Sequence, residues 1–310
     1  MTAARARPIG PALAWAEGSL RLAEVVHAQQ GQLQAVIARL EQGGIEDIHQ
    51  GRVAARRLRS VLRTFAPAFD ERWARLYRMD LRSFARSLAT VREADVHGGV
   101  LDDTAGSNPE FRPAELARLS RVLREERAAV REHLGRHARE HNWRALMKAL
   151  EKRSEQPPRI VRTDVTTAEV LAWVDRAWRK ARRLVKHRPR EVGELHELRL
   201  ALKHCRYALE VVADIEPKAT SRLLRRLRRA QEAIGAHRDT VAAAHWVRSH
   251  ERTLGRPTVA RLEGMLVKRE VRQRRAAARQ GEKVLPAYDE WRTAIRPFMK
   301  PGGVPARRRA

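Results

Sequence analysis

Two stretches of the 310-residue sequence decide the fold: residues 48–65, IHQGRVAARRLRSVLRTF, and residues 195–212, LHELRLALKHCRYALEVV. When His49 is aligned with His196, four further pairs fall into register: Arg52 with Arg199, Arg56 with Lys203, Arg59 with Arg206, and Leu62 with Leu209. Basic and apolar residues in both stretches recur at spacings of three and four, which is the period of one face of an α-helix. Each stretch therefore predicts an amphipathic helix with a cationic side.

A second pair of motifs follows the first pair in the same order. The stretch LATVREADV matches IGAHRDTVA further along, and this match pairs Arg92 with Arg238 and Glu93 with Asp239. The separation is 147 positions in the first pair of motifs and 146 in the second. Two motifs repeated at nearly one separation indicate an internal duplication, and we expect a pseudo-two-fold relation between the halves. A second reading is that Arg92 with Glu93, and Arg238 with Asp239, are structural ion pairs or helix caps.

The remainder of the chain also reads as helical. Apolar residues recur at spacings of three and four, and no sustained alternation typical of β-strands is present. Thr166 and Glu169 have capping-box spacing and predict a helix start. We expect helices, continuous or broken, over residues 15–42, 45–66, 71–104, 114–152, 166–188, 190–213, 217–253, 257–281 and 286–299.

This pattern predicts an all-α fold made of two related helical halves. We expect the first half over residues 15–153 and the second over residues 166–299, joined by a proline-containing linker at residues 154–165. We expect disorder in residues 1–14 and in the basic tail, residues 300–310.

The first motif helix carries an uninterrupted cationic stripe. At 100° per residue, its members fall within an arc of about 80°: His49, Arg52, Arg56, Arg59 and Arg63. Like charges at these spacings destabilise an isolated helix, so a sequence selected only for stability would interleave acidic residues. The second copy repeats the stripe with His196, Arg199, Lys203 and Arg206. This recurrence favours a binding face over a solvated one.

Arginine stripes also occur on other predicted helices. One stripe consists of Arg75, Arg78, Arg82 and Arg86, and another consists of Arg222, Arg225, Arg226 and Arg229. If the two halves face each other, these stripes converge with Arg92 and Arg238 on one channel or groove. A linear polyanion fits such a channel because charge-assisted hydrogen bonds repeat along its length.

The composition also points to an anionic partner. The sequence has 64 Lys and Arg residues against 37 Asp and Glu, a formal net charge of +27, and 55 of the basic residues are Arg. The planar fork of arginine suits phosphate oxygens, although codon bias in a GC-rich genome accounts equally well for the ratio of Arg to Lys. The apolar fraction of 43% excludes a wholly disordered chain, and the single cysteine excludes a disulfide scaffold.

No sequence feature predicts a membrane or secretory protein. No run approaches about 18 uncharged apolar residues, and the N-terminal segment lacks the clean apolar core of a signal peptide. We therefore expect a cytoplasmic protein. Cys205 lies on the second motif helix at the position of Leu58 in the first, and we expect a buried, inert thiol there.

These motifs resemble those of the CHAD family, named for its conserved histidine α-helical domain. The resemblance rests on HQGRVAARRLR from His49, HELRLALKHCRYALE from His196, and the VREADV and HRDTV segments, and it spans roughly residues 15–300. Family members typically show a His-x-x-Arg helix followed by a basic block, once in each half. His204 and Cys205 depart from this pattern, since an Arg-Leu pair is commoner there. Many relatives carry a triphosphatase-like domain, for which this chain has no room, so we expect a stand-alone member.

The resemblance implies one compact domain of two related four-helix-type bundles, with a central basic channel that binds inorganic polyphosphate. It places eight residues in that channel: His49, Arg52, Arg56, Arg59, His196, Arg199, Lys203 and Arg206. The stripes and the second motif pair add seven: Arg63, Arg82, Arg92, Arg222, Arg225, Arg229 and Arg238. We thus expect a non-catalytic, cofactor-free, polyphosphate-binding protein of the cytoplasm, located at polyphosphate granules and involved in phosphate homeostasis.

Two other functions fit the same charge. A nonspecific nucleic-acid-binding protein needs only phosphate contacts, although aromatic residues are few and no zinc-finger or RNA-recognition motif is present. A metal-dependent phosphohydrolase needs clustered carboxylates or histidines. His133, His137 and His141 lie at i, i+4 and i+8, a spacing compatible with metal ligands, but we favour a solvated, titratable face and expect no metal there.

His49 and His196 each precede an arginine by three residues. The surrounding cations disfavour protonation of the imidazole, whereas a bound polyanion favours it. We therefore expect tighter ligand binding as the pH falls toward 6. The alternative is that both histidines fix helix packing at the end of the channel.

Overall fold

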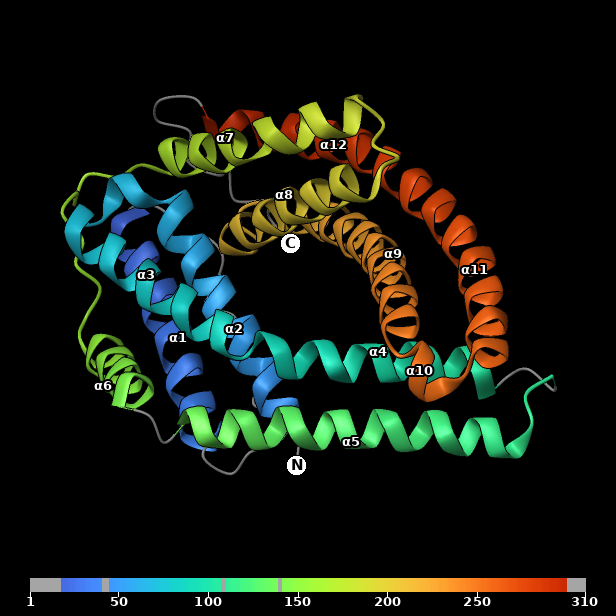
Figure 1. Cartoon of the computed structure of the whole chain (residues 1–310). Coiled ribbons are helices and arrows are strands. Elements are labelled where there is room, and N and C mark those ends of the chain that lie inside the picture. Colours follow the sequence, from blue (N-terminus) through green and yellow to red (C-terminus); the bar gives the residue numbers. More distant parts are fainter. Residues whose placement is uncertain (1–17, 41–44, 107–109, 139–140, 300–310) are drawn as a thin grey trace.

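The computed structural model describes residues 18–40, 45–106, 110–138 and 141–299, and these residues are almost entirely helical (Figure 1). The first half contains α1 (Gly18–Leu40), α2 (Ile45–Thr64), η1 (Ala66–Ala68), α3 (Glu71–Ser87), α4 (Ala89–Gly106), α5 (Pro113–Ala138) and α6 (His141–Glu155). The second half contains α7 (Thr167–Lys186), α8 (Val192–Val211), α9 (Pro217–Ser249), α10 (Glu251–Leu254), α11 (Arg256–Glu282), α12 (Val284–Ile295) and η2 (Arg296–Met299). No strand occurs among these residues, so the all-α prediction is confirmed.

Three of the predicted helices are divided in the structure. The helix predicted over residues 71–104 is two helices: α3 ends at Ser87, and α4 begins at Ala89 after the C-cap residue Leu88, which is buried in the core. The segment predicted over residues 114–152 contains α5 and α6, and residues 217–253 contain α9 and α10. The remaining predicted helices agree with the structure within a few residues. The predicted tails lie outside the described residues.

The predicted helix start at Thr166 is confirmed by its hydrogen bonds. The hydroxyl of Thr166 accepts a hydrogen bond from the backbone N–H of Glu169 at 3.3 Å, and the carboxylate of Glu169 accepts one from the backbone N–H of Thr166 at 3.0 Å. This reciprocal capping box satisfies two N–H groups that the first turn of a helix leaves unpaired. Asp70 caps α3 by accepting from the N–H of Trp73 at 2.7 Å.

Two apolar clusters hold the helices together, and each cluster draws residues from both halves of the sequence. The larger cluster joins α1, α2, α3 and α6 to α7, α8, α9 and α12. The smaller cluster joins α4 and α5 to α9, α10 and α11, which form the lower and right-hand parts of Figure 1. The cores therefore do not coincide with the two sequence halves, and both halves contribute to one fold.

The linker between the halves is fixed to the first half by hydrogen bonds. The side-chain amide of Gln30 donates to the carbonyls of Arg153 at 3.0 Å and Gln156 at 3.2 Å. The N–H of Gly18 donates to the carbonyl of Val165 at 3.0 Å, and a Cβ at Gly18 would lie 2.6 Å from that oxygen. Glycine is therefore required for this close approach. These hydrogen bonds therefore fix the position at which α7 begins.

The two motif helices turn their apolar sides into the larger cluster. Leu58 and Leu62 of α2 and Leu202 and Leu209 of α8 are all fully buried. Cys205, also of α8, is fully buried as well, and burial raises the pKa of its thiol above the ordinary value. The prediction of a buried cysteine at the position of Leu58 is confirmed. The basic sides of α2 and α8 are left outside this core.

Phe65 tests the packing between the halves, because it ends α2 and meets a helix of the second half. Its ring is fully buried and lies edge-on to the ring of Trp173 of α7, with 6.2 Å between centroids. We expect Phe65→Ala to lower the free energy of unfolding by about 3–5 kcal/mol, because the substitution leaves a cavity in the shared core. Urea denaturation followed by circular dichroism measures this change. The control is Arg72→Ala on the exposed side of α3, which we expect to change stability by less than about 0.5 kcal/mol.

Candidate functional site

The two motif helices contact each other directly, and side chains join them at two places. The hydroxyl of Ser60 on α2 lies 2.7 Å from Nδ1 of His204 on α8, and the two are hydrogen-bonded. One turn away, Arg57 of α2 donates to Glu210 of α8 at 3.0 Å. Two guanidinium groups lie over the ring of Tyr207, that of Arg57 at 6.0 Å and that of Arg206 at 4.9 Å from its centroid. These contacts set the basic sides of α2 and α8 next to each other.

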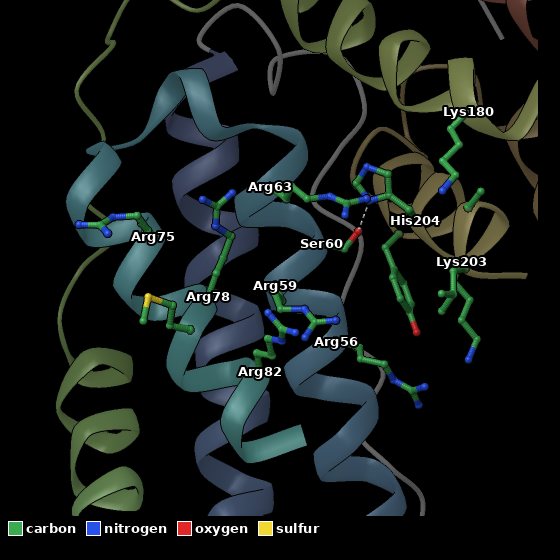
Figure 2. A pocket seen from close by; sticks show the side chains of 14 residues that line it. Arg56, Arg59, Ser60, Arg63, Arg75, Arg78, Arg82, Lys180, Lys203 and His204 are labelled. Atoms are coloured by element: carbon green, nitrogen blue, oxygen red, sulfur yellow. Dashed lines mark hydrogen bonds between the residues drawn. The ribbon is translucent and has the colours of Figure 1, made fainter. Parts of the chain in front are cut away.

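A pocket of about 610 Å³ opens beside this contact, between α2, α3, α7 and α8 (Figure 2). Eight of its fourteen lining residues are cations: Arg56, Arg59, Arg63, Arg75, Arg78, Arg82, Lys180 and Lys203. The other six are Ser60, Met79, Leu200, Ala201, His204 and Tyr207. None of the fourteen is acidic. A concave space of this volume, lined by cations without carboxylates, suits a compact or linear anion.

The cations of α2 and α3 lie close enough to destabilise one another's charge. Burial, and then the charges of Arg63, Arg82 and Arg56, lower the pKa of Arg59 from its ordinary value. Burial and Arg78 lower the pKa of Arg63 in the same way. Figure 2 shows the side chains of Arg59 and Arg82 converging from the two helices. An anion between these guanidinium groups would remove their repulsion, so the site is arranged for one.

Lys203 continues this series of cations into the second half. Burial, and then the charges of Arg56, Arg199, Arg206 and Arg238 in that order of size, together lower the pKa of its amine to about 6. Arg56 comes from the first motif helix, whereas the other three come from α8 and α9. The two copies of the predicted stripe therefore meet at Lys203.

Arg199, His196 and Arg238 extend the cluster beyond the pocket lining. Burial and then Arg238 lower the pKa of Arg199, and burial, Arg238, Arg199 and Lys203 lower the pKa of His196. The Nε atom of Arg199 is buried and has no hydrogen-bond partner among the described residues. Gly235 of α9 makes room for this guanidinium, since a Cβ there would lie 3.3 Å from Nη2 of Arg199. An anion that reached Arg199 would supply the missing acceptor.

His204 lines the pocket as an uncharged imidazole beside the cations. Burial, followed by the charge of Arg63, lowers the pKa of its imidazole to about 4. Its ring is held by Ser60 and lies 3.5 Å from the hydroxyl of Thr64. His204 therefore stays uncharged at neutral pH. In the repeat it stands opposite Arg57, so the second copy replaces a cation with a packing and hydrogen-bonding group.

Arg52 and Arg206 contact other structure, and neither they nor His49 are among the described residues that line the pocket. Arg52 donates from Nη1 to the carbonyl of Ala85 at 2.9 Å and so ties α2 to the end of α3. Arg206 faces Glu210 at 3.4 Å and the ring of Tyr207. His49 is partly buried on α2, more than one turn before Arg56. Of the first stripe, Arg56, Arg59 and Arg63 reach the pocket.

The stripe predicted on α9 lies apart from the pocket. Arg222 faces Glu290 of α12, with 3.7 Å between Nε and the carboxylate, and Arg225 and Arg229 are exposed to solvent. Arg238 follows Arg222 by sixteen positions on the same helix, which corresponds to about 160° of rotation, so the two point to nearly opposite sides. The structure therefore brings Arg238 to Lys203 and leaves Arg222, Arg225 and Arg229 elsewhere. Arg92 lies on α4, and its side chain is outside the described residues.

Several lining residues were absent from the predicted set. Arg75 and Arg78 belong to the α3 stripe of which only Arg82 was selected, so helical spacing alone could have added them. Lys180 lies on α7, and no sequence pattern connects it with the motif helices. Gly235 was part of the repeated motif, but its role depends on how closely α8 and α9 approach.

The described residues contain no group of three or more His, Cys, Asp or Glu side chains able to hold a metal ion. Of the three histidines with metal-ligand spacing, His133 is exposed on α5. The side chains of His137 and His141 lie outside the described residues. The expectation of a solvated face without a metal at these three histidines therefore stays untested.

Comparison with known proteins supplies the family. The CHAD domain model matches residues 24–248, which is more than half of the chain. The chain belongs to the CHAD family. Among curated proteins, the sequence of this CHAD protein has no significant match.

Solved structures share the fold of this CHAD protein. PptA from Streptomyces chartreusis has a TM-score of 0.65 at 20% identity, covering 90% of this chain and 100% of that chain. The CHAD domain from the plant Ricinus communis, known from a crystal structure, has a TM-score of 0.65 at 19% identity, covering 89% and 94%. At these identities the likeness establishes the fold alone. The sequence prediction of the family is confirmed.

The charge of Lys203 gives a stability prediction for this CHAD protein. Because its pKa is about 6 in the folded state and about 10.4 in the unfolded chain, the unfolded state binds more protons between these values. Stability of the ligand-free protein therefore rises with pH across this window, and the cost of Lys203 is largest at the acidic end. We expect Lys203→Met to raise the thermal unfolding midpoint at pH 6.5 more than at pH 9.5.

The matched control is Lys180→Met, because Lys180 lines the same pocket but is exposed and pairs with Glu197 at 3.3 Å. We expect this variant to leave the midpoint nearly unchanged at both pH values. A Lys203→Met variant that is less stable than wild type at pH 6.5 would contradict the assignment of an electrostatically strained cation.

Proposed function

We propose that this CHAD protein binds inorganic polyphosphate, without hydrolysing it, in the pocket between α2, α3, α7 and α8. One observation carries the proposal: among the described residues, eight cations and no carboxylate line a pocket of about 610 Å³. Burial, and then repulsion from neighbouring cations, lowers the pKa values of Arg59, Arg63 and Lys203. A ligand with closely spaced negative charges relieves all of these interactions at once.

A linear chain of phosphates suits the order of the cations. Electrostatic coupling links Arg78 to Arg63, Arg82 to Arg59, and Arg59 to Arg56, and it continues from Arg56 to Lys203. Each guanidinium offers a planar fork of N–H donors that matches the oxygens of a phosphate. A single phosphate group can satisfy only a few of these forks, whereas a chain can satisfy them in sequence.

We propose further that the bound chain extends past Lys203 toward Arg199, Arg238 and His196. The buried, unpartnered Nε of Arg199 and the electrostatic coupling of these three residues support this direction. The path would form the basic channel that the family resemblance implies. It would use residues of both motif copies, which gives a functional reason for the recurrence of the stripe.

The pocket chemistry favours binding over hydrolysis. Metal-dependent phosphoryl chemistry needs carboxylates or other oxygen ligands beside the phosphates. The described lining residues include no Asp or Glu. Their one histidine, His204, is hydrogen-bonded to Ser60. The residues present hold phosphate oxygens and offer no ligand set for a metal that would activate water.

Pocket shape favours polyphosphate over duplex nucleic acid. A duplex is too wide to enter a pocket of about 610 Å³, whereas a single phosphate chain without bases can enter. Aromatic stacking platforms are also absent from the lining, since Tyr207 is 4% exposed. Nonspecific contacts of nucleic acid with the outer arginines stay a second, weaker mode of binding.

The proposed cellular role follows from the ligand. No described helix is both long enough and apolar enough to cross a lipid bilayer. We propose that the protein acts in the cytoplasm, where polyphosphate binding would associate it with polyphosphate granules and with phosphate homeostasis. This proposal rests on the family resemblance and on the pocket.

Charge reversal in the pocket tests the function. Arg56→Glu combined with Lys203→Glu places two carboxylates where the two motif copies meet. We expect the affinity for long-chain polyphosphate to fall at least 100-fold, because two attractive contacts become repulsive. Isothermal titration with polyphosphate at fixed salt measures the change, and fixed salt is needed because phosphate binding is strongly salt-dependent.

The control for charge reversal is Arg225→Glu combined with Arg229→Glu, which changes the net charge by the same amount on α9. Both residues are exposed and lie outside the pocket. We expect less than a fivefold loss. Equal losses in the two double variants would show that net charge, and not the pocket, holds the ligand. A wild-type protein that binds duplex DNA more tightly than polyphosphate at equal phosphate concentration would also contradict the proposal.

The pKa of Lys203 predicts pH-dependent binding. The amine is largely neutral above pH 6 in the free pocket, and a bound polyanion favours its protonated form. Binding therefore takes up a proton, so the affinity rises as the pH falls from 8 toward 6 and levels off below 6. One such proton gives at most a tenfold change per pH unit. His196 acts in the same direction, because burial and Arg238 lower its pKa.

Polyphosphate titrations at pH 6, 7 and 8 measure this slope, with Lys203→Arg as the control because its guanidinium stays charged throughout. We expect Lys203→Arg to retain binding and to lose most of the pH dependence. An affinity that does not change between pH 6 and pH 8 in the wild type would remove proton uptake at Lys203 from the account.

A further inference from the structure

The two lysines of the pocket are in different chemical situations. Lys180 extends from α7, is exposed and pairs with Glu197 at 3.3 Å. Lys203 extends from α8, is partly buried and forms no hydrogen bond or ion pair with any described residue. Figure 2 shows its amine directed away from α8 toward the side on which Arg56 lies. This amine therefore lines the pocket without a hydrogen-bonding or ion-pair partner among the described residues.

Among the described residues, the charges that act on Lys203 are cations from three helices. Arg56 approaches from α2, Arg199 and Arg206 from α8 itself, and Arg238 from α9. Lys180 and His204 share the pocket lining with it. The nearby carboxylates are directed elsewhere: Asp239 acts on Arg199, Glu197 pairs with Lys180, and Glu210 pairs with Arg57.

We propose that Lys203 is a covalent modification site, at which acyl phosphates bound by the pocket arginines acylate the amine. The proposal rests on the proposed function, because it uses the same phosphate-binding residues for a smaller ligand. Acyl phosphates combine a phosphate, which the guanidinium groups hold, with an activated carbonyl carbon. The pocket therefore brings this electrophile to an amine that no carboxylate engages.

The protonation state of Lys203 supports this chemistry. An ordinary lysine, with a pKa near 10.4, has only about one amine in a thousand unprotonated at pH 7.4. The pKa of Lys203 is lowered to about 6 by burial and by the surrounding arginines, so most of its amines carry a free lone pair at that pH. An amine is nucleophilic only in this form, and desolvation next to other cations is a known way to produce it.

The reaction balances without a further reactant. The amine nitrogen of Lys203 attacks the carbonyl carbon, and a C–N bond forms. The bond between that carbon and the bridging phosphate oxygen breaks, and its electron pair leaves with the phosphate. The proton lost from nitrogen ends on the departing phosphate, so the products are an amide and hydrogen phosphate. The pocket arginines stabilise the phosphate as charge develops on it.

Acylation and polyphosphate binding would exclude each other at this residue. An amide carries no positive charge and fills space between Arg56 and Arg199, so the acylated pocket has lost a cation at the meeting point of the two motif copies. Conversely, bound polyphosphate favours the protonated form of the amine and covers it, and so protects it from acylation. A higher concentration of acyl phosphate would therefore lower the affinity of the protein for polyphosphate through acylation of Lys203.

The test is acetylation of the full-length protein by acetyl phosphate at pH 7.4, with the rate at each lysine measured by peptide mass spectrometry. We expect Lys203 to be acetylated at least tenfold faster than Lys180, which shares the pocket, and than Lys148, which is exposed on α6. Long-chain polyphosphate should slow the reaction at Lys203 at least tenfold and change the rate at Lys148 less than twofold. A rate at Lys203 no higher than at Lys180, or no protection by polyphosphate, would overturn the inference.

Arg59→Gln separates phosphate positioning from simple reactivity of the amine. With acetyl phosphate, we expect Lys203 to be acetylated more slowly in this variant than in the wild type. With acetic anhydride, which has no phosphate to hold, we expect the rate at Lys203 divided by the rate at Lys148 to be at least as high as in the wild type. Equal slowing with both reagents would contradict a role for Arg59 in holding the phosphate.

The inference and the proposed function fail in different ways. Polyphosphate affinity is measured in parallel on unmodified wild type, on Lys203→Gln as an uncharged mimic, and on Lys203→Arg. We expect at least a tenfold loss for Lys203→Gln and less than a threefold change for Lys203→Arg. If the unmodified protein binds polyphosphate but Lys203 is not acetylated preferentially, only the inference fails. If the unmodified protein does not bind polyphosphate, the proposed function fails.

Discussion

The contact between α2 and α8 is the interaction on which the rest of the structure depends. The two helices bury Leu58, Leu62, Leu202 and Leu209 in one apolar cluster, and this burial supplies the favourable free energy that holds their basic sides together. The basic sides would separate if only their own interactions counted, because they repel each other. The hydrophobic core therefore holds a cationic surface in an arrangement that is unfavourable until an anion binds.

The strained cations identify the site more clearly than the net charge does. Many of the arginines are on the outside, where ion pairs such as Arg222 with Glu290 are solvated and contribute little to stability. Inside the pocket, Arg59, Arg63 and Lys203 lack carboxylate partners and have lowered pKa values. Groups that are shifted by burial and like charge, and that face one cavity, are typical of binding sites. The positive charge of the chain is therefore distributed unequally, and the binding site that we propose lies where the two motif copies meet.

The sequence was sufficient for the fold class and the family, because both depend on local patterns. The spacing of apolar residues predicts the helices, and the repeated motif predicts that residues such as Arg56 and Lys203 share a role. What the sequence could not supply is the rotation of each helix in its tertiary position. Lys180 joins the site only because α7 packs beside α8, and Arg222, Arg225 and Arg229 are turned away although their spacing equals that of the first stripe. Gly235 likewise matters only because α8 and α9 approach closely enough for Arg199 to lie against it.

The measurement that tests the central claim most directly is a crystal structure of the protein with a bound short polyphosphate chain. The account predicts phosphate groups in the pocket between Arg59, Arg82, Arg56 and Lys203, with the chain continuing toward Arg199. A structure in which the phosphates lie along Arg222, Arg225 and Arg229 on the outer side of α9, with the pocket empty, would contradict it.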